Sequence, residues 1–410
     1  MRAQLEAAGM ATGDDVSEAD VLLVNTCTVT RRADQEARQL LRRLAREHPD
    51  ARLIATGCYA QRAPEELRAI PGVSLVLGVH ERERVAEHVR DATTRVVVGP
   101  ARARHALTTA APLSFGRTRA LLKVQDGCDA FCSYCVVPYV RGRDRSLPMA
   151  DAVAQARRLV DAGFHEIVIT GADLGSYGRQ GSGPGLLPEL IRRLLALGQS
   201  HRIRLSSIEP NKVDPEIVSM MGAEPRLCRH LHLPLQSGSD AVLEAMRRPY
   251  RAEDYSALLE RIAARGPVAV GADVIVGFPG EGDREFEETV TFLRALPLAY
   301  LHVFRYSPRP GTVAARQPAS VPPSVLRARA RHVRELGEAK RAAFLRSLIG
   351  SRVSVLAEAG RVGSAIVARS DFADPVLIRG APAWSGFRDA WIRATEGGRW
   401  AGSLAEEALG

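Results

Sequence analysis

Three cysteines placed close together constrain this chain more than any other feature of its sequence. Cys128, Cys132 and Cys135 are separated by three and then by two residues, and they make up half of the 6 cysteines. The run before them, residues 119–124 (RALLKV), is short and apolar and predicts a buried strand. We therefore expect the three thiols on the loop that leaves this strand, where functional residues tend to collect.

Clustered thiolates are soft ligands that select iron–sulfur clusters, zinc or copper(I). Zinc usually needs a fourth Cys or His, often from a second Cys-x-x-Cys pair, and the sequence contains no such pair. Three thiolates would instead leave one iron of a four-iron cluster open for a small molecule. With the aromatic Tyr134 beside the last cysteine, this arrangement resembles the signature of radical S-adenosylmethionine (radical SAM) enzymes. The alternative interpretation is three buried or fortuitous thiols.

The composition is that of an ordinary water-soluble protein with a basic balance. The 410 residues predict two to three domains, and 25% charged with 46% hydrophobic residues is typical of such proteins. The sequence has no apolar run of about 18 residues and no signal-peptide pattern, so we expect a cytoplasmic protein with no membrane partner. The net charge of +9 favours a polyanionic partner such as RNA, although a generally basic proteome would explain it equally well.

The first hundred residues alternate between strand and helix patterns, which predicts a parallel sheet covered by helices. The expected strands are residues 19–25, 51–56, 73–77 and 95–98, and the expected helices are 31–47, 64–69 and 80–90. Cys27 and Cys58 come just past the first two strands, so they should face the same crevice, where open sheets bind ligands. They are candidate ligands of a second cluster; the alternative is two small buried hydrophobes.

Residues 99–117 have a linker composition, and repeated strand–helix units follow them. Six strand-like runs, at 119–124, 166–170, 203–207, 230–235, 269–276 and 300–306, predict a partial (β/α) barrel. Barrel sites lie at the carboxyl ends of the strands. The polar residues at these ends include Asp173, Glu209, Gln236 and Ser237. Gly277 begins a Gly/Pro turn that lets a backbone approach a ligand closely.

The last third of the chain predicts a basic helix and a small β domain. The helix, residues 324–348, is either a solvated spacer or part of a track for RNA. Residues 350–410 have short β-like runs with glycine between them, and their length suits a five-stranded barrel of the kind that often binds nucleic acid. Cys228 precedes a strand, at the rim opposite the expected chemistry, so we interpret it as structural.

Several long motifs then resemble those of the tRNA methylthiotransferases, across nearly the whole chain. They are NTCTVT (25–30), TGCYAQ (56–61), GCDAFCSYCVVPYVRGR (127–143), LSSIEP (205–210), HLHLPLQSGSD (230–240), DVIVGFPGE (273–281) and YSPRPGT (306–312). The family consists of radical SAM enzymes with two [4Fe–4S] clusters and a C-terminal RNA-binding TRAM domain. The resemblance implies an α/β protein with a doubly wound parallel N-terminal domain, a partial (β/α)6 radical SAM barrel and a C-terminal β-barrel. The implied boundaries are 1–98, a linker at 99–117, 118–320, a basic connector at 321–349, and 350–410.

Within the family, the first two motifs and residues 301–304 (LHVF) look most like the branch that acts on threonylcarbamoyladenosine. This implies a transferase that inserts sulfur at C2 of the modified adenosine 37 and then methylates it. One alternative is the isopentenyladenosine-37 branch. A rival of another class is a non-catalytic RNA-binding paralogue whose cluster is structural.

The resemblance also implies a division of labour among the candidate site residues. The cluster on Cys128, Cys132 and Cys135 would pass one electron into S-adenosylmethionine, because an aromatic C–H is beyond an ordinary general base. A second cluster, on Cys27 and Cys58, would present the sulfur. Candidate contacts to S-adenosylmethionine are Glu209, Gln236, Ser237 and Gly277, with Arg141 and Arg143 as candidates for pairing with its carboxylate. The implied partners are the tRNA anticodon stem-loop, a flavodoxin- or ferredoxin-type electron donor and a sulfur donor.

One departure from the family pattern concerns the start of the chain. The family has three ligands in the N-terminal domain, the first on a loop after the opening strand, and here only Cys27 and Cys58 match. Met1 falls within a helical pattern that has no N-cap before it. From the sequence we therefore expect a working enzyme that begins upstream and supplies the third thiolate; the alternative is a lineage-specific loss.

Overall fold

The computed structural model describes residues 1–91, 95–101, 107, 118–179, 183, 185–318 and 321–405. The chain forms two compact units, each built from several segments. The first unit comprises Met1–Ala111, Asp126–Arg145 and Ser307–Gln317, and the second comprises Pro112–Gln125, Ser146–Tyr306 and Pro318–Gly410. Most of the expected linker, residues 102–106 and 108–117, lies outside the described residues. None of the described helices is both long enough and apolar enough to cross a membrane.

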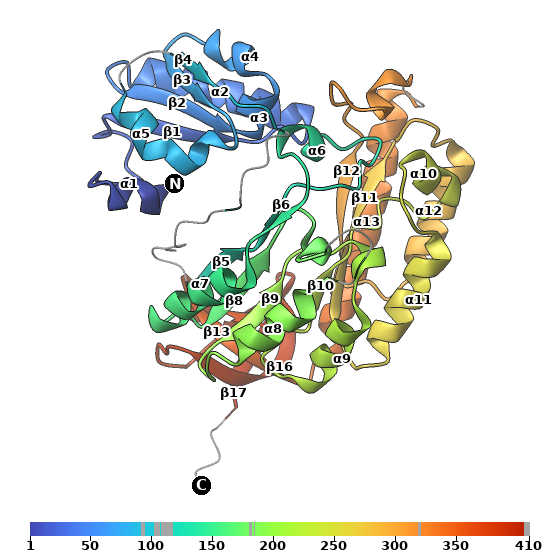
Figure 1. Ribbon diagram of the computed structural model, residues 1–410. Coiled ribbons are helices and arrows are strands. Elements are labelled where there is room, and N and C mark those ends of the chain that lie inside the picture. The colour runs from blue at the N-terminus through green and yellow to red at the C-terminus, as the bar shows by residue number, and fades with distance from the viewer. Residues whose placement is uncertain are drawn as a thin grey trace. The chain divides into compact units, whose positions relative to one another are not determined.

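The first unit is built on a parallel four-stranded sheet in the order β1-β2-β3-β4 (Figure 1). The strands are β1 (Val21–Thr26), β2 (Arg52–Gly57), β3 (Val73–Leu77) and β4 (Arg95–Val97). The helices of this unit are α1 (Arg2–Ala7), α2 (Arg31–Glu47), α3 (Cys58–Arg62), α4 (Pro64–Arg68), α5 (Val85–Arg90) and α6 (Val137–Val140), with 3-10 helices η1 (Glu81–Arg84) and η4 (Ala314–Arg316).

Helices cover both faces of this sheet because each carries one apolar stripe. Helix α2 begins after Thr30, whose hydroxyl accepts a hydrogen bond from the Ala33 amide at 3.1 Å, as an N-cap residue does. Its buried residues Ala37, Leu41 and Leu44 recur at helical spacing and join a cluster with α3, α4 and one face of the strands. Helices α1 and α5 pack in a separate cluster with the other face.

The second unit contains the barrel strands, arranged as two parallel three-stranded sheets, β5-β8-β9 and β10-β11-β12. The strands are β5 (Arg119–Lys123), β8 (Glu166–Thr170), β9 (Arg202–Leu205), β10 (His230–His232), β11 (Ala269–Val276) and β12 (Tyr300–Arg305). Isolated bridges at Ile203↔Leu227 and Ser207↔His232 connect the two sheets. The result is the partial barrel that six strand-like runs predicted.

Helices alternate with these strands along the chain (Figure 1). They are α7 (Met149–Asp161), α8 (Leu187–Leu195), α9 (Pro215–Ala223), α10 (Asp240–Ala245), α11 (Ala252–Ala263), α12 (Asp283–Ala295) and α13 (Pro323–Ser347), with 3-10 helices η2 (Leu174–Ser176) and η3 (Pro210–Lys212). Two short strands, β6 (Gln125–Asp126) and β7 (Arg145–Ser146), form a further two-stranded sheet.

The C-terminal segment of the second unit closes into a five-stranded barrel in the order β13-β14-β15-β17-β16. Its strands are β13 (Arg352–Val362), β14 (Ala365–Ser370), β15 (Pro375–Ile378), β16 (Phe387–Glu396) and β17 (Arg399–Leu404). Trp400 is fully buried in its core and donates from Nε1 to the Leu345 carbonyl of α13 at 2.7 Å. The closed barrel confirms the small β domain, and with the parallel sheets it confirms the predicted α/β fold class.

A buried ion-pair network joins the C-terminal barrel to strands β8 and β9. The Glu166 carboxylate accepts hydrogen bonds from Arg202 (2.7 Å) and Arg204 (2.9 Å). Arg202 and Arg204 also donate to backbone carbonyls of the barrel, including that of Ser370. Burial alone would raise the pKa of Glu166, but the two guanidinium groups outweigh burial and hold this pKa well below its usual range.

Candidate functional site

The three-cysteine loop belongs to the first unit and is shaped by glycine. Gly127 has a φ of +75°, and a Cβ added there would lie 1.9 Å from the Arg143 carbonyl oxygen. Only glycine allows this close approach of two backbone segments. The Cys128 amide then donates to the Gly142 carbonyl at 3.2 Å, so the loop closes on itself.

The surroundings of the three thiols suit an iron–sulfur cluster. Cys132 is buried, whereas Cys128 and Cys135 are half-buried. The Ala130 amide lies 3.4 Å from the Cys128 sulfur, and hydrogen bonds to cluster sulfurs are one means by which a protein sets reduction potential. Three thiols on one short, glycine-shaped loop therefore fit a cluster that keeps one iron open.

Cys27 and Cys58 directly follow two adjacent strands in matching register. Thr26 of β1 pairs with Gly57 of β2, and these are the last residues of their strands. The first residue after each strand is therefore a cysteine at the same edge of the sheet. Gly57 has a φ of +104°, and a Cβ there would lie 2.3 Å from the Thr26 carbonyl oxygen. The Val29 amide lies 3.5 Å from the exposed Cys27 sulfur, and Cys58 is buried. The two thiols thus lie at the same edge of the sheet, and their role as cluster ligands stays a prediction.

Arg141 connects the three-cysteine loop to this second pair. Its Nε lies 3.4 Å from the Cys58 sulfur, and its Nη1 lies 3.6 Å from the Asp126 carboxylate. Burial opposes the charged guanidinium, but the nearby charges of Cys58, Asp126 and Cys27 outweigh it and raise the pKa of Arg141. Pairing with a cofactor carboxylate stays a prediction for Arg141; its contacts within the first unit are to a sulfur and an aspartate.

Arg143 is the more exposed of the two predicted arginines. Its Nε lies 3.2 Å from Asp129, and its guanidinium stands 5.2 Å from the centre of the Phe131 ring. Phe131 itself has a φ of +46°, a conformation that bulky residues adopt only under constraint. The structure thus places Arg143 over the same loop that carries the cysteines.

A buried network around Asp34 links the loop after β1 to residues 307–317 of the same unit. Asp34 accepts hydrogen bonds from Thr28 (2.5 Å), Arg62 (3.0 Å) and Arg309. Arg309 also donates to the Thr28 hydroxyl at 2.9 Å. The sequence interpretation missed this network, because it treated NTCTVT and YSPRPGT as separate motifs. The sequence did offer one signal. NTCTVT supplies hydrogen-bond acceptors beside a cysteine, and YSPRPGT contains a single arginine that can donate to them.

The predicted cofactor contacts in the second unit lie at strand ends and already have protein partners. Glu209 pairs with Arg248, whose Nη1 lies 3.3 Å away. Gln236 is buried and has a φ of +73°, and the Ser237 hydroxyl lies 3.1 Å from that of Thr289. Their roles toward S-adenosylmethionine therefore remain predictions.

Gly277, the last predicted contact, stands in a left-handed conformation with a φ of +75°. Its amide donates to the Glu281 carboxylate at 2.8 Å, and a Cβ at this position would lie 2.4 Å from Leu326 of α13. Burial raises the pKa of Glu281, although Arg329 donates to it at 2.9 Å. The turn is thus fixed by the protein's own contacts.

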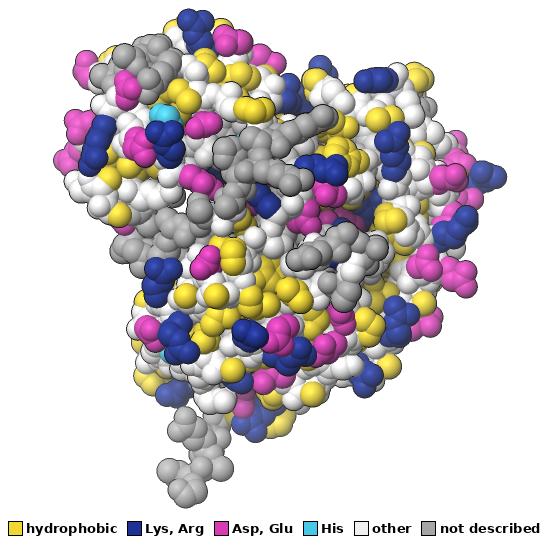
Figure 2. Space-filling model, viewed as in Figure 1, with side chains coloured by type: hydrophobic (Ala, Val, Ile, Leu, Met, Phe, Trp, Pro, Cys, Tyr) yellow, Lys and Arg dark blue, Asp and Glu magenta, His cyan; other side chains and the backbone are white. Residues whose placement is uncertain are grey.

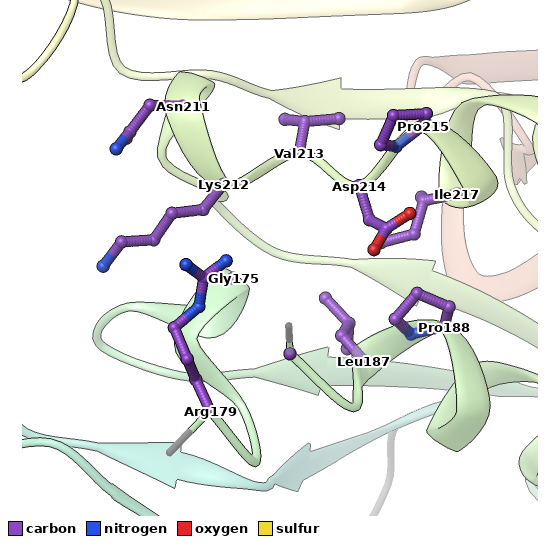
Figure 3. Close-up of a pocket in the computed structure, with 11 residues that line it drawn as sticks. Gly175, Arg179, Leu187, Pro188, Asn211, Lys212, Val213, Asp214, Pro215 and Ile217 are labelled. Carbon is purple, nitrogen blue, oxygen red and sulfur yellow. The ribbon is translucent and has the colours of Figure 1, made fainter. Parts of the chain in front are cut away.

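A polar hollow of about 200 Å³ lies where η2 and η3 face each other. Figure 3 shows Arg179 and Lys212 extending toward the same side of this hollow. Lys212 lies 2.5 Å from Asp173 and 2.7 Å from the Ser176 hydroxyl. Asp173, singled out in the sequence as a polar strand-end residue, therefore forms an ion pair with Lys212.

Comparison with known proteins agrees with this geometry. The family model described as "Radical SAM superfamily" matches residues 122–293, and that described as "Uncharacterized protein family UPF0004" matches residues 1–78. The chain is 41% identical over 327 residues to the threonylcarbamoyladenosine tRNA methylthiotransferase MtaB of Bacillus subtilis, covering 78% of this chain and 72% of that protein. It is 38% identical over 344 residues to the protein of the same name from Aquifex aeolicus, covering 82% and 83%.

The chain belongs to the tRNA methylthiotransferase family. It is therefore a radical SAM enzyme, with S-adenosylmethionine and a [4Fe–4S] cluster as its cofactors. Among solved structures, it resembles the radical S-adenosylmethionine methyltransferase TsrM from Kitasatospora setae with cobalamin and a [4Fe–4S] cluster bound. That likeness has a TM-score of 0.50 at 18% identity, covers 72% of this chain and 65% of the other, and concerns the fold alone.

Proposed function

We propose that this methylthiotransferase acts on N6-threonylcarbamoyladenosine at position 37 of tRNA and replaces the C2 hydrogen with a methylthio group. The observation that carries the proposal is the 41% identity to a relative of that name, over 327 residues. The proposal is also supported by the membership of the three-cysteine loop and the Cys27–Cys58 pair in one compact unit.

Cys128, Cys132 and Cys135 would hold the cluster that serves S-adenosylmethionine. When bound, that cluster supplies the electron for radical cleavage of the cofactor, which no side chain of this protein can supply. The chain's own part is to fix the loop through Gly127 and to surround Cys132 with protein that excludes water. Glu209, Gln236, Ser237 and Gly277 are the proposed contacts to S-adenosylmethionine.

Cys27 and Cys58 would hold a second cluster, which supplies the sulfur. Their placement at one sheet edge supports this, as does the Arg141 guanidinium 3.4 Å from the Cys58 sulfur. A cation beside a thiolate lowers the cost of its negative charge in a buried setting. Arg141 would therefore stabilise the thiolate form of Cys58 and keep it in position for the metal.

The tRNA anticodon stem-loop would be bound partly through the C-terminal barrel and helix α13. The net charge of +9 supports an electrostatic contribution. Figure 2 shows Lys and Arg side chains intermingled with Asp and Glu on the face in view, so on that face the charge is spread out. A flavodoxin- or ferredoxin-type electron donor and a separate sulfur donor complete the proposed set of partners in the cytoplasm.

A second candidate substrate is isopentenyladenosine at the same tRNA position. The chain is 37% identical over 421 residues to a tRNA-2-methylthio-N(6)-dimethylallyladenosine synthase of Cereibacter sphaeroides, a match that spans 100% of this chain and 94% of that protein. This alignment is longer than the first, although its identity is lower.

The deciding experiment offers both substrates to one enzyme preparation. Anaerobically reconstituted protein would be incubated with S-adenosylmethionine, a reductant and anticodon stem-loops that contain either modified adenosine. Mass spectrometry of the digested nucleosides should show methylthiolation of threonylcarbamoyladenosine and none in a Cys132→Ala control. Methylthiolation of the isopentenyl substrate alone would reverse the assignment, and cluster-loaded protein that modifies neither would contradict both.

A further inference from the structure

A second group of metal-ligating side chains lies on three neighbouring strands of the second unit and contains no cysteine. His232 ends β10, Asp273 lies in β11 and His302 lies in β12. Asp273 and His302 are direct partners in the parallel register. One nitrogen or oxygen of each side chain lies within 4.8 Å of those of the other two.

The distances in this group match ligands that share one ion. The Asp273 Oδ1 lies 3.0 Å from His232 Nε2 and 3.4 Å from His302 Nδ1. Two ligand atoms bound at about 2.1 Å from one metal ion are about 3.0 Å apart at a right angle and about 3.4 Å apart at the tetrahedral angle. Both separations therefore fall within the range that a single coordination sphere imposes.

The second ring nitrogen of His232 also has a partner, as it does in most metal-bound histidines. Its Nδ1 lies 3.2 Å from the Tyr300 hydroxyl, which lies 2.8 Å from His230 Nε2. Metal-bound histidines almost always donate their second nitrogen to such an acceptor, which fixes the tautomer. Gly271 makes room for this arrangement, since a Cβ there would lie 1.9 Å from the Tyr300 ring.

Metal binding selects one of the two neutral tautomers of His232. The tautomer that donates from Nδ1 to the Tyr300 hydroxyl leaves the Nε2 lone pair, 3.0 Å from Asp273 Oδ1, available to an ion. The other tautomer donates from Nε2 to Asp273 and accepts from Tyr300, and it is the arrangement that satisfies these contacts without a metal.

We propose that His232, Asp273 and His302 bind one divalent transition-metal ion, distinct from the iron–sulfur clusters. Two histidines and one carboxylate form the donor set that suits Zn²⁺, Fe²⁺, Mn²⁺ or Co²⁺, with coordination positions left open. The His302 side chain is 56% exposed, which gives the ion an entry path and leaves room for water or an anionic oxygen ligand. The site does not depend on which adenosine the enzyme modifies.

Cobalt(II) is a suitable probe because its spectrum reports the donor atoms. Cluster-loaded protein would be titrated anaerobically with Co²⁺, and bound cobalt measured by elemental analysis after gel filtration. We expect one equivalent with visible ligand-field bands and no thiolate-to-cobalt charge-transfer band. His302→Asn, chosen because His302 is the most exposed ligand, should weaken binding at least tenfold without moving the thermal unfolding midpoint.

A control variant and a variant of the outer partner keep the test specific. His332→Asn, on helix α13, should bind cobalt like the wild type. Tyr300→Phe should weaken binding about tenfold, the effect expected for loss of an outer partner. Absence of bound cobalt, a spectrum dominated by thiolate charge transfer, or binding unchanged in both His302→Asn and Asp273→Asn would overturn the proposal.

Discussion

Two polar centres of this molecule use charge in different ways. In the second unit, Glu166, Arg202 and Arg204 sit on strands and neutralise one another, and their remaining donors reach backbone carbonyls of the C-terminal barrel. In the first unit, Cys27 and Cys58 follow strands and stand beside Arg141. One centre is satisfied by protein alone, whereas the other presents soft ligands at a sheet edge.

The difference teaches which substitutions separate folding from chemistry. Removing one member of a satisfied buried ion network leaves an uncompensated charge inside the protein and should lower stability. Removing a thiol from a loop deprives a metal of a ligand and should leave most of the fold intact. The predictions below test this contrast, from the largest expected effect to the smallest.

The largest effect is expected from Cys132→Ala, which should abolish reductive cleavage of S-adenosylmethionine and remove the iron bound by the three-cysteine loop. Three thiolates are the least that can hold a cluster with one open iron. Cys228→Ala is the matched control, because Cys228 is fully buried and burial raises the pKa of its thiol to about 11. Product analysis and iron content check both variants; full cleavage activity in Cys132→Ala would refute the site assignment.

Glu166→Gln should lower the free energy of unfolding by about 3–5 kcal/mol, because two buried guanidinium groups lose their counter-charge. Glu189, which pairs with Arg192 and Arg193 at the surface, provides the control, and Glu189→Gln should change stability far less than Glu166→Gln. Denaturant unfolding measures both. Equal effects of the two substitutions would show that the network contributes no more than a surface pair.

The same network predicts a pH dependence with a definite sign. The folded-state pKa of Glu166 lies well below its usual value, so the unfolded chain takes up the proton first as the pH falls. The stabilisation is fully present above the unfolded pKa of about 4.3 and is lost progressively below it. Between pH 6 and pH 3 the wild type should therefore lose more stability than Glu166→Gln. An equal loss of stability between pH 6 and pH 3 in the two proteins would contradict this prediction.

Arg141→Ala should reduce iron bound at the Cys27–Cys58 pair about tenfold while the cluster of the three-cysteine loop is retained. The guanidinium lies beside Cys58, and its removal raises the cost of the thiolate. Arg143→Ala is the control, since Arg143 contacts Asp129 and Phe131 instead of a sulfur. Iron stoichiometry and electron paramagnetic resonance distinguish the two clusters. Equal iron loss in both variants would remove the special role of Arg141.

The fold was largely predictable from the sequence because its elements have strong periodicity. Helix α2, strand β8 and strand β11 have the bounds that the pattern predicted. Strand β10 is shorter than expected, ending at His232 instead of Leu235, because Pro234 in the predicted run has no amide hydrogen to donate to a ladder. Pro234 is a local signal, so this earlier end of the strand could have been predicted from the sequence.

The candidate site was predictable only as far as its motifs are local. Cysteine spacing identified the candidate metal ligands, but it could not show that Arg141 contacts Cys58, 83 positions away in sequence. The Asp34–Arg309 contact spans 275 positions, and the His232–Asp273–His302 group depends on strand register. Each of these contacts depends on the tertiary fold, so residue type and spacing alone could not establish it.

The smallest effect concerns RNA binding by the C-terminal barrel. The prediction tests whether the barrel binds RNA in addition to packing against strands β8 and β9. Trp391 on β16 is a large apolar side chain with 37% exposure, and the Arg393 guanidinium stands 5.7 Å from its ring. An exposed aromatic with an adjacent arginine is the arrangement on which unpaired bases stack, worth about 1–3 kcal/mol per base. We therefore expect Trp391→Ala to weaken binding of the tRNA stem-loop about tenfold.

A point substitution is the right instrument here, because deleting residues 350–410 would also strip Arg202 and Arg204 of their carbonyl partners. Val362→Ala, an exposed apolar residue of the same barrel, is the control and should leave binding unchanged. Titrations at several salt concentrations separate base stacking from phosphate contacts. Stacking changes affinity at every salt concentration, whereas phosphate contacts set the slope of log affinity against log salt concentration. The slope should therefore be the same in Trp391→Ala and the wild type. Undiminished affinity in Trp391→Ala would show that this face of the barrel does not contribute to RNA binding.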